Sequence, residues 1–179
     1  MVYDKIIGID PGVSQGCICH MNEKGYHTTR MPREAIDIER VFKTLRADSE
    51  SPLAFIEKVN TWNTDQDNPG KQFHIDKMNK NYAQIIALLI SVGIPYIEVH
   101  PATWQAILGL RPKKGENLSK TERKNRHKEA AQMYTMRKLS LWQADGVCIA
   151  EFGFRKVTSD PAYIHQNIKG QLKQSTLLF

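Results

Sequence analysis

The segment Lys5–Asp10 constrains the fold more than any other part of this sequence. It is a short β-branched run that ends in an Asp-Pro-Gly sequence, which predicts a strand followed directly by a turn. Two further strands are expected over residues 14–20 and 26–31, joined by a hairpin turn at 22–25. A chain that opens with three such strands needs helices to cover the resulting sheet.

The rest of the chain supplies alternating helical and strand patterns, which predict an α/β fold with a mixed sheet flanked by helices. A polar, turn-rich stretch over residues 60–73 is typical of a functional or mobile loop. We expect residues 1–155 to form one domain and residues 156–179 a polar C-terminal tail. The expected strands are 53–59 and 95–99, and the expected helices are 33–46, 76–92, 102–108, 121–138 (capped by Ser119 or Thr121) and 142–152.

Three carboxylates stand in apolar surroundings along these elements. Asp10 ends the first strand, Glu57 lies inside an apolar run, and Asp145 is near the start of another. A buried carboxylate is costly unless it is paired or bound to a metal. Each also has a simpler interpretation: Asp10 could organise its turn, Glu57 could pair with Lys58 or Lys5, and Asp145 could cap the last helix. Taken together, the three favour a metal site.

The ion that suits such a site is Mg²⁺, which prefers a few carboxylates together with water and phosphate oxygens. Two ions can activate water on one side of a phosphodiester and stabilise the leaving oxygen on the other. We therefore expect two Mg²⁺ ions per site, with Mn²⁺ as a substitute. The formal net charge of +6 agrees with a polyanionic partner such as nucleic acid.

The positive charge is concentrated in residues 111–138, where ten Lys and Arg stand against three Glu. This local excess of +7 exceeds the charge of the whole chain, and it suits phosphate contacts along one helical face. A solvated basic helix is the alternative. Lys120 or Lys124 could also reach the scissile phosphate, and the sequence does not choose between them. The expected DNA-binding residues here are Lys113, Lys114, Lys120, Arg123, Lys124, His127 and Lys128.

The ordered set of motifs resembles the RuvC-type Holliday-junction resolvases of the ribonuclease H-like superfamily. The similarity rests on Ile7-Gly8-Ile9-Asp10-Pro11-Gly12, on Ile56-Glu57-Lys58-Val59, on residues 77–99 followed by His100-Pro101-Ala102-Thr103, and on residues 144–150. The resemblance implies a ribonuclease H-like five-stranded mixed sheet, a homodimer, and Mg²⁺-dependent nicking of symmetric strands at a four-way DNA junction. It also implies that Asp10, Glu57 and Asp145 are the catalytic metal ligands.

The sequence departs from this family at two positions. Trp142 stands where the family usually carries an acidic residue or histidine one turn before the last aspartate. Asn60 stands where the family places an aromatic residue, and Trp62 is the nearest substitute. We hypothesise that Trp62 stacks on a splayed base at the junction. The alternative is a loop aromatic folded back on its own domain.

The C-terminal residues 174–179 resemble the short peptide by which bacterial replication proteins dock on the sliding clamp. Gln174 would supply hydrogen bonds, and Leu177 and Phe179 would fill an apolar groove. The alternative is a tail that packs on its own domain or on a dimer partner. Neither a signal-peptide pattern nor a membrane-spanning apolar run is present, so we expect a cytoplasmic protein without membrane contact.

Three functions follow from these patterns. The first is a junction-resolving endonuclease that uses the three carboxylates. The second keeps the fold but assigns a structure-specific DNA-binding protein with a degraded catalytic site, because Trp142 replaces an acid. The third is an actin-like or sugar-kinase-like ATP-binding domain, for which the chain is short and lacks a second phosphate-binding glycine loop.

Overall fold

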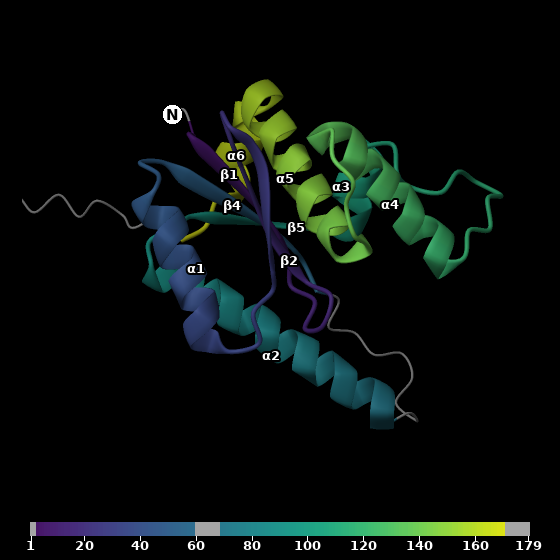
Figure 1. Ribbon diagram of the computed structural model, residues 1–179, viewed down its shortest axis with the longest axis horizontal. Helices are drawn as coiled ribbons and strands as arrows, with labels where there is room; N and C mark the ends of the chain where they lie inside the picture. The colour runs from purple at the N-terminus through teal and green to yellow at the C-terminus, as the bar shows by residue number, and fades with distance from the viewer. Residues whose placement is uncertain (1–2, 60–68, 171–179) are drawn as a thin grey trace, which may run out of the picture.

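The computed structural model describes residues 3–59 and 69–170, in which five strands form one mixed sheet (Figure 1). The strand order is β3-β2-β1-β4-β5; β1, β2 and β3 are antiparallel neighbours, while β4 and β5 run parallel to β1. The carboxyl ends of β1, β4 and β5 therefore meet at one edge of the sheet. The strands are β1 (Lys5–Asp10), β2 (Cys17–Asn22), β3 (Gly25–Arg30), β4 (Pro52–Glu57) and β5 (Tyr96–Val99).

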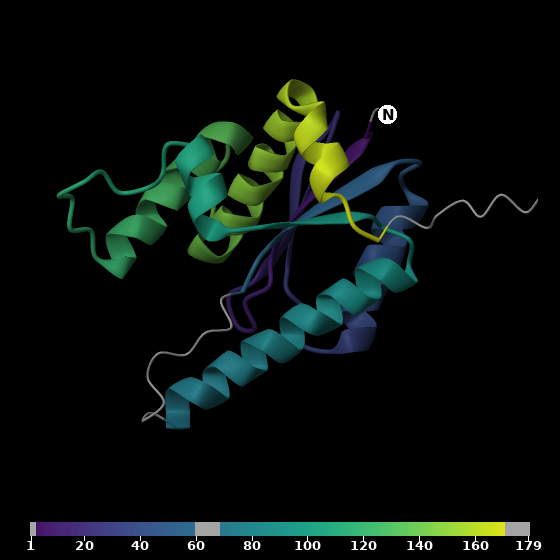
Figure 2. The same cartoon turned by 180° about the vertical axis from the view of Figure 1, so that it is seen from behind.

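Helices cover both faces of the sheet (Figures 1 and 2). One face packs against α1 (Ala35–Ala47) and α2 (Pro69–Ser91), and the other against α3 (Pro101–Ile107), α4 (Lys120–Thr135), α5 (Leu141–Ser159) and α6 (Pro161–Asn167). Each face has its own apolar core, as expected for a sheet that is buried on both sides. In the described part of the chain, no helix has the length and apolar character needed to cross a membrane.

Alternation along β1 sends its side chains to the two cores in turn. Ile7 and Ile9 are fully buried with α1 and α2, whereas Ile6 is buried with α5. Because side chains on a strand alternate between faces, Lys5 points to the α1 side and Asp10 to the α5 side. The two charged ends of this strand therefore face different helices.

The predicted order of strands and helices is confirmed. Ser119 caps α4: its hydroxyl accepts from the Glu122 N–H (3.2 Å) and its N–H donates to the Glu122 carboxylate (2.7 Å). Helix α2 begins at Pro69, inside the stretch interpreted as a loop. The helix expected over 142–152 continues to Ser159 and is followed by α6, so the expectation of a polar tail is wrong for these residues.

Candidate active site

Two glycines let α5 lie directly against the sheet beside the end of β1. A Cβ atom on Gly8 would lie 2.3 Å from the Gly146 carbonyl oxygen, and one on Gly146 would lie 2.7 Å from Cys17 Sγ. Neither position has room for a side chain, so the backbone of α5 rests on β1 and β2. This close packing brings Asp145, the neighbour of Gly146, toward Asp10.

Asp10 organises the turn that follows β1, as its simpler interpretation predicts. Its Oδ1 accepts a hydrogen bond from the Gly12 N–H at 3.0 Å, and Asn81 Nδ2 from α2 donates to the Pro11 carbonyl at 2.7 Å. Asp10 also lines a cavity of about 240 Å³ together with Glu57. Asp10 therefore both stabilises the turn and lines the cavity.

Glu57 ends β4 beside Asp10 and is held by a tryptophan. Its Oε2 accepts a hydrogen bond from Trp104 Nε1 at 2.9 Å. Trp104 belongs to α3, and its side chain is fully buried. The suggested pairing with Lys5 is wrong, because the Lys5 ammonium donates to backbone carbonyls of α1 and the residues after it. The hydrogen-bond partner of Glu57 is a neutral donor, so this bond adds no positive charge beside the carboxyl.

Asp145 lies within α5 and has two basic partners from α4. His127 Nδ1 is 2.8 Å from Asp145 Oδ1, and the Lys124 ammonium forms an ion pair with Oδ2. The expectation that Asp145 caps its helix is wrong, because α5 begins after Ser140, whose N–H donates to the Gln143 side chain at 2.7 Å. Asp145 is buried and fixed from two directions.

Trp104 and His127 connect the two halves of the site. Their rings meet edge to face with centroids 5.0 Å apart and an interplanar angle of 67°. Trp104 fixes Glu57, and His127 fixes Asp145, so a continuous set of contacts joins the carboxylates on β4 and α5. Aromatic pairs in this arrangement add to the rigidity that their burial provides.

The three carboxylates influence one another electrostatically. Burial, and next the negative charge of Asp145, raise the pKa of Asp10 to about 6. Burial and the charges of Asp10 and Asp145 raise the pKa of Glu57 to about 8. Burial alone would raise the pKa of Asp145 too, but the bond to His127 and the charge of Lys124 hold it below its ordinary value. The site thus concentrates more negative charge than Lys124 compensates.

The donor set suits a divalent cation in type and charge. Within residues 3–59 and 69–170, no three His, Cys, Asp or Glu side chains lie close enough together, as placed, to enclose a metal ion. The Lys124 ammonium lies against Asp145. Burial lowers the pKa of Lys124, but the charges of the three carboxylates outweigh this effect and raise the pKa above its ordinary value. Carboxylate oxygens with raised proton affinity are groups that Mg²⁺ or Mn²⁺ would stabilise in the ionised form.

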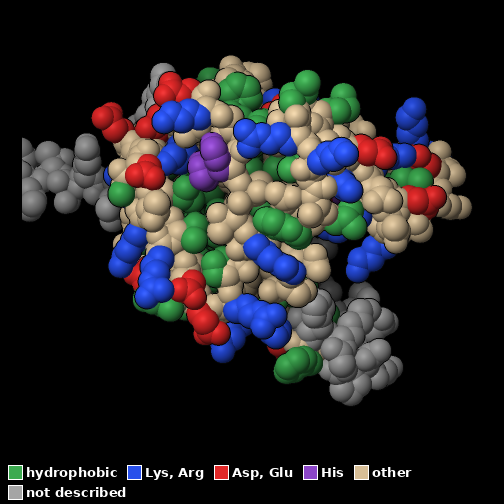
Figure 3. Space-filling view, viewed as in Figure 1, with side chains coloured by type: hydrophobic (Ala, Val, Ile, Leu, Met, Phe, Trp, Pro, Cys, Tyr) green, Lys and Arg blue, Asp and Glu red, His purple; other side chains and the backbone are tan. Residues whose placement is uncertain are grey.

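The expected DNA-binding residues of α4 and the preceding loop divide into two groups. Lys113, Lys114, Lys120 and Arg123 are exposed, whereas Lys124 and Lys128 are half-buried. His127 differs from expectation: it is buried against Asp145, so it faces the site and not the solvent. Figure 3 shows Lys and Arg side chains over the α4 side and also over the lower part of this face, where α1 and α2 lie.

Sequence patterns alone do not assign Trp104 or His127 to the carboxylates; they predict DNA binding for His127 and do not single out Trp104. Trp142, noted because it replaces an acid, is partly buried and packs against the core on the α5 side. The histidine beside Asp145 comes instead from α4, eighteen positions earlier. The residues Trp62, Gln174, Leu177 and Phe179 lie outside the described part of the chain.

The fold of this chain has counterparts among solved structures, although its sequence has no match among family models or curated proteins. The mixed five-stranded sheet with helices on both faces is a ribonuclease H-like fold.

Among solved structures, this chain is similar to RuvC of Thermus thermophilus in complex with a Holliday junction substrate. The TM-score is 0.57 at 12% identity, covering 87% of this chain and 96% of that one. A second Thermus thermophilus RuvC structure gives a TM-score of 0.55 at 13% identity, covering 92% and 98%. The protein therefore has a RuvC-like fold along nearly its whole length.

Proposed function

We propose that this protein is a metal-dependent endonuclease that cleaves branched DNA and resolves Holliday junctions by paired phosphodiester hydrolysis. The observation that carries the proposal is the group of three electrostatically coupled carboxylates, Asp10, Glu57 and Asp145, at the carboxyl edge of the sheet. The RuvC-like fold supports it, and one of the similar structures holds a Holliday junction substrate.

Asp10, Glu57 and Asp145 would hold two Mg²⁺ ions, or Mn²⁺ in their place. Such ions activate a water for attack and stabilise the charge that develops on the leaving oxygen. The protein's own residues supply the positioning: Trp104 orients Glu57, while His127 orients Asp145. The Lys124 ammonium, beside Asp145, would neutralise negative charge on a phosphate brought into the cavity.

The exposed cations on the α4 side would hold the DNA beside this site, and a homodimer would present two sites to symmetric strands. Lys113, Lys114, Lys120 and Arg123, which are exposed, would contact phosphates together with the half-exposed Lys128. Trp62, beyond the described residues, stays a candidate for stacking on a junction base. A cytoplasmic location also stays a prediction.

One observation favours a second function, a structure-specific DNA-binding protein that does not cut. Trp142 packs into the core where an acidic residue or histidine would add a ligand, and Lys124 already occupies one oxygen of Asp145. If the carboxylates hold no metal, the basic surface would still bind branched DNA. Metal-dependent cleavage separates the two functions.

The deciding experiment is the cleavage of a labelled synthetic four-way junction, with plain duplex as the competing substrate. Reactions contain Mg²⁺, Mn²⁺ or EDTA, and Asp10→Asn is compared with wild type. The endonuclease predicts paired, symmetric nicks that require metal and disappear in the variant. Tight junction binding with no nicks in either metal would favour the non-cutting function.

We also propose that residues 174–179 dock on a sliding clamp through Gln174, Leu177 and Phe179. A chain ending at residue 173 should lose clamp capture on a pull-down and keep junction cleavage. Clamp capture that survives the deletion would contradict this proposal without affecting the nuclease.

A further inference from the structure

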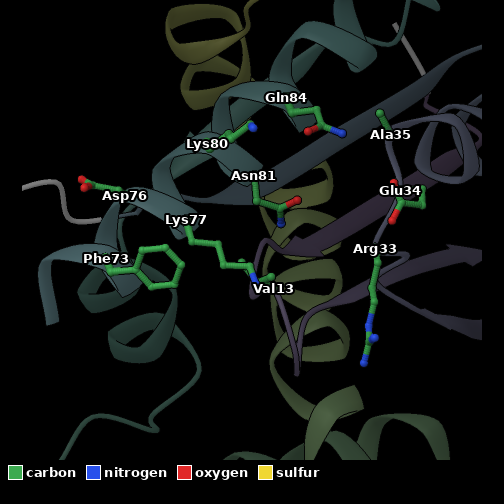
Figure 4. A pocket seen from close by; sticks show the side chains of 10 residues that line it. All are labelled: Val13, Arg33, Glu34, Ala35, Phe73, Asp76, Lys77, Lys80, Asn81 and Gln84. Carbon is green, nitrogen blue, oxygen red and sulfur yellow. The ribbon is translucent and has the colours of Figure 1, made fainter. Parts of the chain in front are cut away.

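A second cavity, larger than the one lined by Asp10 and Glu57, lies next to the turn that follows β1, with Val13 in its wall. Its volume is about 550 Å³, and it opens between the segment before α1 and the first half of α2 (Figure 4). We call it the α1–α2 cleft. It is lined by Val13, Arg33, Glu34, Ala35, Phe73, Asp76, Lys77, Lys80, Asn81 and Gln84.

The α1–α2 cleft carries three exposed cations. Arg33, Lys77 and Lys80 are exposed, and among the described residues none of them forms an ion pair. Other cations of the molecule are paired, for example Lys43 with Glu39. Cations that line one cavity, with no ion pair among the described residues, favour an anionic ligand, although Glu34 and Asp76 also line the wall.

Helix α2 forms a wall of both this cleft and the carboxylate cavity. Ile75 and Met78 line the carboxylate cavity, while Lys77 and Lys80 line the α1–α2 cleft. The bond from Asn81 to the Pro11 carbonyl ties the helix to the turn between the two cavities. Figure 4 shows Lys77 extending from α2 toward Val13, with Arg33 on the other side of the opening. A strand lying over the carboxylates could therefore cross the turn into the cleft.

Phe73 adds an aromatic surface next to these cations. It is 72% exposed, the largest exposure of any aromatic side chain in the described residues, and it lines the same cleft as Lys77. Exposed aromatic rings beside cations are typical of surfaces that bind unpaired nucleotides, because bases stack on the ring while the cations contact the phosphates. A duplex without unpaired bases would not use such a ring.

We propose that the α1–α2 cleft binds the sugar-phosphate backbone of a DNA strand that leaves the carboxylate cavity, with Phe73 stacked on an unpaired base of that strand. This inference rests on the proposed function, since it assigns a strand path to the same branched substrate. It predicts that part of the affinity for branched DNA comes from Arg33, Lys77 and Lys80, on the α2 side of the site.

The test measures equilibrium binding of wild type and Lys77→Gln/Lys80→Gln to a four-way junction in EDTA, over a range of salt concentrations. The matched control, Lys24→Gln/Lys43→Gln, removes the same charge from the hairpin turn and from the second half of α1, and neither residue lines the cleft. Each lost phosphate contact lowers the salt slope by about 0.9, so the cleft variant should lose about 1.8 while the control keeps the wild-type slope.

Phe73→Ala tests the stacking part on a junction that carries 2-aminopurine at the branch point. Wild type should change the fluorescence of the unpaired base, and the variant should lose most of that change while keeping its salt slope. An equal salt slope in the cleft variant and the matched control would overturn the proposal. So would a shift in sedimentation with unchanged DNA binding, which would assign the cleft to contact with a second copy.

These outcomes are distinguishable from failure of the nuclease proposal. Wild type that binds the junction but never cuts it would contradict the enzyme, while the salt slopes would still report on the cleft. Wild type that cuts the junction, with equal slopes in the cleft variant and the control, would contradict the cleft alone. Wild type with no affinity for branched DNA would contradict both.

Discussion

Each end of β1 carries a charged side chain, and the partners of the two charges differ. Lys5 is 4% exposed, and its ammonium donates to the carbonyl oxygens of Leu45 (3.2 Å) and Asp48 (3.0 Å) at the end of α1. At the other end, Asp10 faces Asp145 and Glu57 and receives one backbone N–H. The charge of Lys5 is satisfied inside the protein, because the carboxyl end of a helix attracts cations.

The difference separates a structural charge from a functional one. A buried charge with its full set of partners stabilises one fold and needs nothing from outside. The carboxylates repel one another, and the pKa values of Asp10 and Glu57 are raised by burial and by that repulsion. An added cation would relieve the repulsion, so the Asp10 end is where we place the chemistry.

Asp10→Asn should abolish function without harming the fold. The amide keeps the Oδ1 acceptor for the Gly12 N–H but removes the charge, so junction cleavage should fall at least about 10²-fold. Gel assays of nicked strands measure the loss, and Asp37→Asn on the surface of α1 is the matched control. If Asp10→Asn cleaved the junction at the rate of the control, the assignment of Asp10 to the active site would be contradicted.

Lys5→Met should have the opposite effect, because it should lower the stability of the fold and leave cleavage unchanged. Two carbonyl groups at the end of α1 would lose a charged donor, and the free energy of unfolding should fall by about 2 kcal/mol. Urea unfolding measures this loss, and cleavage per folded molecule should stay at the wild-type rate. If the variant stayed stable but cut DNA poorly, the contrast between the two ends of β1 would be mistaken.

Trp104→Phe should weaken cleavage through Glu57. The Trp104 N–H lowers the pKa of Glu57, so its removal should raise that pKa further above about 8. Cleavage at neutral pH should fall about 10-fold, the scale of losing a group that orients a metal ligand, and should partly recover at higher pH. Trp142→Phe is the control, since Trp142 packs on the same core without a bond to a carboxylate. Equal pH profiles for the two variants would contradict the role of Trp104.

Glu57→Gln should stabilise the protein in EDTA. The folded-state pKa of Glu57 is raised from 4.5 to about 8, so its contribution to stability is fully present below pH 4.5 and is lost as pH rises toward 8. Glutamine removes this loss, so the variant should be more stable than wild type at pH 8 and about equally stable at pH 4. Urea unfolding at both pH values checks the sign, and a variant less stable at pH 8 would contradict it.

Much of the fold follows from local pattern, because its main elements are strongly apolar. The run Lys5–Asp10 coincides with β1, and Asp145 lies in the helix that its apolar neighbours predict. Helix α6 escapes such a pattern, since only one of its residues, Ile164, is deeply buried while polar positions face solvent. A short helix with so few core positions carries little periodic signal.

The residues of the candidate site also differ in how far the sequence predicts them. The three carboxylates are visible in the sequence because each interrupts an apolar run, which is a local feature. Trp104 and His127 come from α3 and α4, and their contacts depend on how those helices pack beside β4 and α5. His127 shares a helical spacing with surface lysines, so its spacing alone could not show that it faces Asp145.

Binding of Mn²⁺ tests most directly whether the Asp10 end of β1 needs a cation. The thermal unfolding midpoint is measured in EDTA and in saturating Mn²⁺, for wild type, Asp10→Asn and Lys5→Met. We predict that Mn²⁺ raises the midpoint of wild type and of Lys5→Met by roughly 5 °C or more, and leaves that of Asp10→Asn unchanged. An equal rise in all three proteins, or no rise in wild type, would contradict a metal site built on these carboxylates.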